Sequence, residues 1–140
     1  GTQIRAPREN QTKPNQTIPM SSHHLVASVD ALANLIPNGA KLAIFKDNGV
    51  PMALGAALIR RQARDLHLVT VPTGNLLPDI LIGAGCVRTI ETSGLSLGEF
   101  GPAPRFIDAV KSAAVEVLDA TCPAVYAGLQ VAEKGLPFMP

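Results

Sequence analysis

Four short polar segments, each rich in turn-forming residues, follow apolar runs of the sequence and carry the side chains best suited to bind a ligand. They are residues 46–49, 72–75, 92–98 and 119–122. Three of them contain glycine, and together they offer the hydroxyl and amide side chains of Asn48, Thr73, Asn75, Ser93 and Thr121. If helices begin after these segments, their unpaired N–H groups favour a carboxylate or phosphate by about 0.3–1 kcal/mol per exposed terminus. The pattern therefore predicts a site for a negatively charged ligand.

Ten residues in and beside these segments are our candidates for contact with a substrate. They are Phe45, Asn48, Gly49, Thr73, Gly74, Asn75, Ser93, Gly94, Glu99 and Phe100. Glu99 is the only carboxylate in the glycine-rich segment 93–102, where a solvated loop acid is the commoner role. We therefore treat it as a contact residue, and we assign no catalytic residue to this chain.

The cysteines and histidines show no arrangement that suggests a metal site. Cys86 and Cys122 are far apart and form no CxxC pair, so we interpret both as free thiols. Cys122 comes close to a predicted helix start, where thiols become reactive, but a small buried cysteine is the commoner case. His67 lies in an apolar run and is expected to be a satisfied core residue.

The apolar runs before the polar segments predict strands at residues 41–45, 66–71, 87–92 and 115–118. Helices are expected from an N-cap at Ser22 to the stop at Pro37, from about Pro51 to Gln62, over 76–82, around 106–110, and from about Thr121. This alternation predicts right-handed crossovers and an α/β, Rossmann-like fold: a mainly parallel sheet with helices on both faces. The carboxyl ends of parallel strands meet at one edge, so the four polar segments should gather there.

Two glycine patterns favour structural roles. Gly55, inside a predicted helix, indicates close packing against a neighbour. The run Gly83-Ala84-Gly85 resembles a phosphate loop, but it precedes a strand and so lies at the opposite edge of the sheet. Termination of a helix explains it better.

Composition limits the partners of the chain. Residues 1–21 are rich in Pro, Asn, Gln and Thr and predict a flexible tail, which leaves 22–140 as one domain. The chain has 12 basic and 11 acidic residues without a basic stripe, only 4% aromatic residues and no Trp, so we expect no nucleic-acid partner. No apolar run reaches the roughly 18 residues that a membrane span needs. We therefore expect a cytoplasmic protein without a membrane partner.

Five stretches of the sequence occur in the order and spacing of one known enzyme family. They are residues 49–54, 64–69, 81–85, 100–106 and 135–140. With these stretches the chain resembles, over about residues 25–140, the N-terminal half of the alpha subunit of family I coenzyme A transferases, the glutaconate and 3-oxoacid type. The resemblance implies an enzyme of alpha and beta subunits that moves coenzyme A from an acyl-CoA to a carboxylate.

The resemblance also implies what this chain lacks. In the family, a glutamate of the beta subunit forms an acyl-glutamyl anhydride and then a glutamyl-CoA thioester. The matching loop here, residues 72–74, has no carboxylate, so the nucleophile must come from another chain. A Gly-Gly-Phe turn of the alpha subunit helps to build the oxyanion site. Here Phe45 directly follows Ile44, and the glycine pair is missing.

Two functional interpretations follow. In the first, the chain is an alpha-like half that needs a beta-like partner and takes coenzyme A or acyl-CoA as substrate, with no bound cofactor. In the second, it is a non-catalytic module that binds acyl-CoA or another anion, or that has a structural role in an oligomer. A truncated domain leaves a sheet edge or an apolar face uncovered, so both interpretations predict a homo-oligomer or a beta-like partner.

Overall fold

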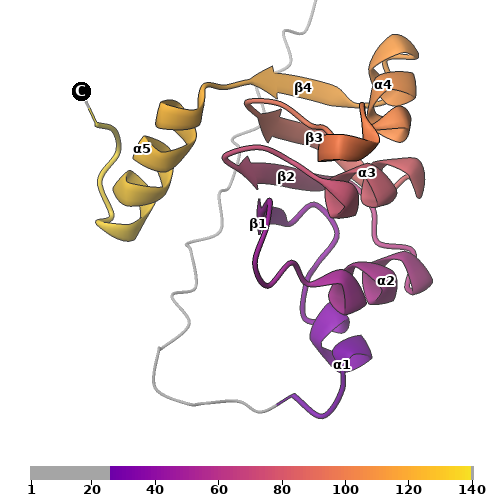
Figure 1. Cartoon of the computed structure of the whole chain (residues 1–140). Coiled ribbons are helices and arrows are strands. Elements are labelled where there is room, and N and C mark those ends of the chain that lie inside the picture. The colour runs from indigo at the N-terminus through magenta and orange to yellow at the C-terminus, as the bar shows by residue number, and fades with distance from the viewer. Residues whose placement is uncertain (1–25, 140) are drawn as a thin grey trace, which may run out of the picture.

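The computed structural model describes residues 26–139, so the tail predicted for residues 1–21 lies outside the described residues. Helices and strands alternate along the whole described chain (Figure 1). Their order is α1 (Val29–Asn34), β1 (Lys41–Phe45), α2 (Met52–Arg60), β2 (Leu66–Val71), α3 (Leu76–Gly83), β3 (Val87–Thr92), η1 (Gly98–Phe100), α4 (Pro104–Lys111), β4 (Glu116–Asp119) and α5 (Cys122–Glu133).

The four strands form one parallel sheet in the order β1-β2-β3-β4. The predicted bounds of the first three strands are confirmed at both ends, whereas β4 both begins and ends one residue later than predicted, after the buried Val115. The predicted α/β fold with a parallel sheet is therefore confirmed.

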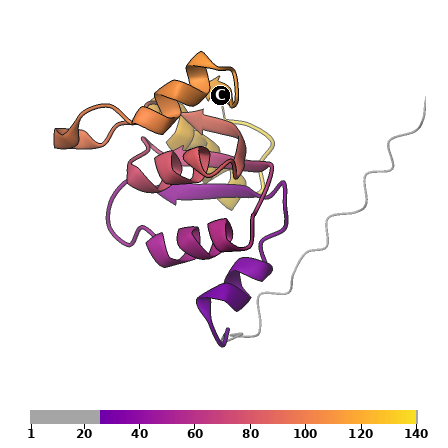
Figure 2. The same ribbon diagram turned by 90° about the vertical axis from the view of Figure 1, so that its right-hand side faces the viewer.

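Helices cover the two faces of the sheet unequally. Figures 1 and 2 show α2, α3 and α4 on one face and α5 alone on the other. This follows from the strand order, because three successive right-handed crossovers between neighbouring strands place their helices on the same side. Within residues 26–139, the second face is thus only partly covered.

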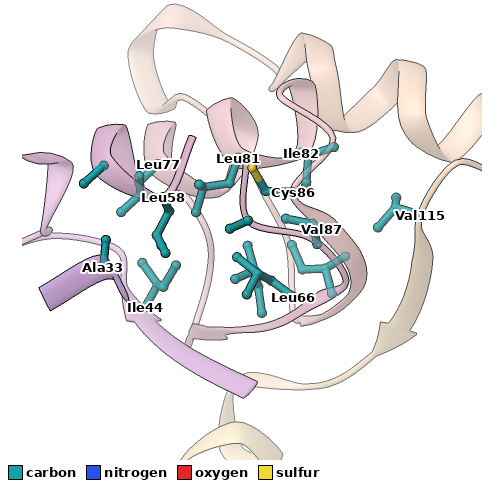
Figure 3. Close-up of a cluster of buried hydrophobic side chains, with 14 residues drawn as sticks. Ala33, Ile44, Leu58, Leu66, Leu77, Leu81, Ile82, Cys86, Val87 and Val115 are labelled. Carbon is teal, nitrogen blue, oxygen red and sulfur yellow. The ribbon is translucent and has the colours of Figure 1, made fainter. Parts of the chain in front are cut away.

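The main core lies between the sheet and the helices α2 and α3 (Figure 3). Leu66, Leu68, Leu81 and Ile90 are completely buried in it, and each contributes about 1.5–3 kcal/mol by leaving water. Cys86 belongs to the same cluster with 1% of its surface exposed. Burial raises the pKa of the Cys86 thiol, although Arg61 and Arg64 act in the opposite direction.

The first helix is shorter than the sequence predicts. It begins at Val29, where the Ser28 hydroxyl accepts a hydrogen bond from the Ala31 N–H at 3.1 Å. Residues 26–28 lie outside the helix, so the predicted helical run through them is wrong, and the predicted cap, Ser22, lies outside the described residues. Ser28 provides the cap instead, directly before the first helical residue.

Close contacts fix how α3 packs against its neighbours. A Cβ atom on Gly55 of α2 would lie 2.2 Å from Leu77 Cδ1, so the prediction that Gly55 marks close packing is confirmed. Asp79 of α3 is fully buried and accepts hydrogen bonds from Arg105 Nη1 and from the Phe106 N–H, both at 2.9 Å. These bonds join α3 to the first turn of α4.

Candidate functional site

The loops after β2 and β3 are joined by backbone hydrogen bonds at the carboxyl edge of the sheet. The Gly74 N–H donates to Gly94 O at 2.8 Å, and the Ser96 N–H donates to Gly74 O at 3.3 Å. A Cβ atom on Gly74 would lie 2.9 Å from Leu95 Cγ, so a larger residue here would force the Leu95 side chain to shift. The structure thus brings Gly74 and Gly94 together, with the Gly74 amide used in the loop contact itself.

Two buried threonines at the ends of β2 and β3 form hydrogen bonds that stabilise these loops. The Thr70 hydroxyl donates to Thr92 Oγ1 at 2.6 Å, and the Thr92 hydroxyl donates to Gly94 O at 2.8 Å. Thr92 Oγ1 also accepts from the Gly94 N–H at 3.1 Å. Because both side chains are buried and hydrogen-bonded, they fix the strand ends in one conformation.

The start of α5 meets the same loops. Thr121 caps this helix, with its hydroxyl accepting from the Ala124 N–H at 3.3 Å. The Ser93 hydroxyl donates to Pro72 O at 2.6 Å and lies 3.2 Å from Cys122 Sγ. Cys122 is exposed, so the expectation of a small buried cysteine is wrong. Ser93, Cys122 and Thr121 form an accessible polar group at the carboxyl edge.

The remaining predicted contact residues lie around this edge with different exposures. Phe45 ends β1 and is 60% exposed, and Asn48 and Gly49 form a turn with positive φ angles of 52° and 78°. Thr73 and Asn75 are half-buried, and the Asn75 side chain makes no capping bond to α3. Their amide and hydroxyl groups are therefore placed beside the Gly74 loop.

Glu99 and Phe100 lie apart from the Gly74 and Gly94 contact. Both belong to η1, in a loop that projects from the body of the molecule (Figure 2, orange, at the left). Both are exposed, Phe100 to 90%. The Glu99 carboxylate is thus a solvated loop acid, as the sequence suggested.

A second polar cluster, which the sequence analysis did not identify, lies on the face of the sheet that α5 partly covers. Lys41 Nζ donates to Glu91 Oε2 at 3.0 Å, and His67 Nε2 lies 3.5 Å from the same oxygen without making a hydrogen bond. His67 is therefore not the satisfied core residue that we expected. The alternation of polar and apolar residues along the strands could have indicated that these side chains share a face. That the three lie together depends on how the strands are aligned with one another, which the sequence does not show.

Metal and membrane features are not found in the described part of the chain. Within residues 26–139, no group of three or more His, Cys, Asp or Glu side chains could hold a metal ion. No helix in this range is long and apolar enough to cross a lipid bilayer. Cys86 and Cys122 are both free, as predicted.

Two solved structures are similar to this chain. One, a variant of the decarboxylase AibA/AibB, is 31% identical with a TM-score of 0.72, and the match covers 81% of this chain and 45% of the other. The second, glutaconate coenzyme A-transferase from Acidaminococcus fermentans, is 23% identical with a TM-score of 0.71 and coverages of 80% and 36%. This chain has a coenzyme A transferase-like fold.

The two similar structures are considerably longer than this chain. The chain spans less than half the length of either of these structures. No protein-family model matches the sequence, and no curated protein matches it significantly. The coenzyme A transferase-like fold is therefore established at the level of architecture, which positions the loops of the carboxyl edge but does not by itself assign their chemistry.

Proposed function

We propose that this chain is the alpha-like half of a two-chain enzyme that acts on acyl-CoA substrates. The observation that carries the proposal is the match in fold, over four fifths of the chain, to an enzyme described as a coenzyme A-transferase. The ordered carboxyl edge supports it, because Thr73 and Asn75 present a hydroxyl and an amide side chain there. Hydroxyl and amide side chains of this kind can donate hydrogen bonds to a substrate carboxylate and orient it.

The partner supplies the nucleophile in this proposal. A glutamate of the partner attacks the thioester carbonyl of acyl-CoA, the C–S bond breaks, and coenzyme A leaves as the thiolate. The thiolate then attacks the glutamyl carbonyl of the anhydride, which releases the acyl group as a carboxylate and leaves a glutamyl-CoA thioester. The loop 72–75 of this chain has no carboxylate that could replace the glutamate. Its part is to position the substrate and to exclude water from the anhydride.

A second candidate activity is decarboxylation of a CoA ester. The more similar of the two structures in sequence, at 31% identity, is described as a decarboxylase. The missing glycine pair before Phe45 also favours this alternative, because an oxyanion site that serves acyl transfer would lose backbone donors there. In this case too the chain acts with a partner.

The test combines the full chain with a beta-like chain encoded in the same genome. We expect coenzyme A to pass from acetyl-CoA to a carboxylate acceptor only when both chains are present, and not when the partner's glutamate is replaced by glutamine. Release of CO₂ from a CoA ester with a carboxylate on its acyl group, without transfer, would establish the decarboxylase instead. Saturable binding of coenzyme A by calorimetry without either reaction would support a non-catalytic module. Transfer by this chain alone would overturn the assignment of the nucleophile.

A further inference from the structure

A cavity of about 370 Å³ lies between α5 and the second face of the sheet. This volume falls in the range of about 300–1,000 Å³ that is typical of small-molecule sites. Its walls are mostly apolar: Ala43 and Val69 come from the sheet, and Val125, Leu129 and Ala132 come from the helix. The charged pair Lys41 and Glu91 forms the polar part of the lining.

A glycine in α5 contributes to this space. Val125, Gly128, Leu129 and Ala132 follow the helical spacing i, i+3, i+4 and i+7, so they form the helix face turned to the sheet. Glycine inside a helix is less stable than alanine, yet a Cβ atom on Gly128 would meet no atom within 4 Å. Gly55 is different, because Leu77 leaves no room for its Cβ. Close packing thus explains Gly55 but not Gly128, which leaves the cavity open.

The polar lining offers one free donor group and one free acceptor. The Lys41 ammonium has three N–H groups, of which one donates to Glu91 Oε2. The contacts that residues 26–139 make to Glu91 use Oε2, so Oε1 can accept a further bond. The two charges cancel, so a charged head group would be repelled by one member of the pair as it approached the other.

We propose that this cavity binds a small molecule with a neutral head group that both accepts and donates hydrogen bonds, such as a carboxamide, on an apolar chain. The amide oxygen accepts from Lys41, the amide N–H donates to Glu91, and the chain packs against Val69 and Leu129. The site is separate from the carboxyl edge, because Lys41 begins β1 and lies about 13 Å along the strand from Phe45. The inference therefore does not rest on the proposed function.

Three probes with the same chain and different head groups test this proposal on the full protein. They are hexanamide, hexanoate and hexylamine, titrated at pH 8 while amide shifts are followed by heteronuclear NMR. We expect saturable shifts at Ala43, Val69 and Leu129 with hexanamide, and binding about tenfold weaker for the two charged probes. Equal affinity for all three probes, or no saturable shift with hexanamide, would overturn the proposal.

Substitutions make the test specific to the cavity and to its charges. Gly128→Leu fills the space and should abolish binding, whereas Gln130→Leu, on the same helix outside the lining, should leave it unchanged. Glu91→Gln removes the negative charge that neutralises Lys41, so hexanoate should become the preferred probe. Lys41→Met removes the positive charge that neutralises Glu91, so hexylamine should become the preferred probe. Unaltered binding in Gly128→Leu would place the ligand elsewhere, and an unaltered order of probes in the two charge variants would exclude the ion pair as the head-group site.

Discussion

The two cysteines differ in burial, and burial determines their chemistry. Cys86 is 1% exposed and its pKa is raised, mainly because burial disfavours the thiolate. Cys122 is exposed at the first turn of α5. We expect a thiol-specific disulfide reagent at pH 8 to label Cys122 first, and Cys86 at least about tenfold more slowly, at a rate limited by opening of the core. Time-resolved absorbance measures both phases.

Single-cysteine variants show which thiol is responsible for each of the two labelling phases. Cys122→Ser should remove the fast phase and leave the slow one, and Cys86→Ala should do the reverse. Equal rates for the two thiols in the native protein would contradict the burial of Cys86.

Asp79 links α3 to α4 through two hydrogen bonds. Its replacement by Ala removes the acceptor for the Phe106 N–H and for Arg105 Nη1. We expect a loss of about 2–3 kcal/mol in the free energy of unfolding, because a part-buried backbone donor is left unpaired and the buried carboxylate is lost. Urea denaturation measures the loss. Arg105→Gln is the matched control and should cost about 1 kcal/mol or less, since the Arg105 side chain is half-exposed. An equal loss in both variants would mean that the ion pair, and not the backbone bond, is the main interaction.

At the scale of the elements, local pattern predicts the strands well. Apolar runs followed by turn-forming residues predicted β1, β2 and β3 at both ends, and β2 and β3 are also largely buried. The helix starts were less predictable, since Ser22 and Ser28 are equally good caps in the sequence. Contacts between distant residues were not predictable: the group of Lys41, His67 and Glu91 depends on the strand register, and Asp79 finds its partners 26 and 27 residues further along.

The sequence predicts the position of the candidate site at the carboxyl edge of the sheet, but not the contacts between its residues. A parallel sheet predicts that the polar segments after the strands gather at one edge, and Gly74 and Gly94, from the loops after β2 and β3, do lie together there. The use of the Gly74 amide within the loop contact could not be foreseen, because it depends on how closely two backbones approach. The same holds for Ser93 and Cys122, which are 29 residues apart and come from different elements.

Two helical glycines allow a comparison at the same scale. Gly128→Ala in α5 should raise the free energy of unfolding by about 0.5–1 kcal/mol, because alanine is the better helix former and its Cβ meets no atom. Gly55→Ala in α2 should lower it by about 1–2 kcal/mol, because overpacking against Leu77 outweighs the same helical gain. Thermal and urea unfolding of the two variants measure both changes. A gain in Gly55→Ala would show that Leu77 moves aside at little cost.

The whole molecule presents two unlike faces, which is the physical basis for expecting association. Helices cover one face of the sheet, while among residues 26–139 the second face carries α5 alone, packed through Val125 and Leu129 against Val69 and Val71. β4 is an edge strand of the sheet and each of its residues is exposed, so its backbone groups can pair with another chain. Large apolar side chains of this strand are exposed, including Leu118 at 39%. Soluble proteins commonly cover such surfaces with a partner.

We therefore expect the purified chain to self-associate, or to bind a beta-like partner, through β4 and the second face. Light scattering after size-exclusion chromatography at micromolar concentration should give at least twice the mass of 14.6 kDa in the absence of a partner. Leu118→Asp should weaken the association at least about tenfold, because it places a charge in an interface that must lose water. Leu35→Asp is the matched control: Leu35 is 69% exposed at the end of α1, away from that face, and its replacement should leave the mass unchanged. A monomer that also fails to bind a beta-like chain would show that α5 and the edge charges Glu116 and Asp119 protect the sheet sufficiently on their own.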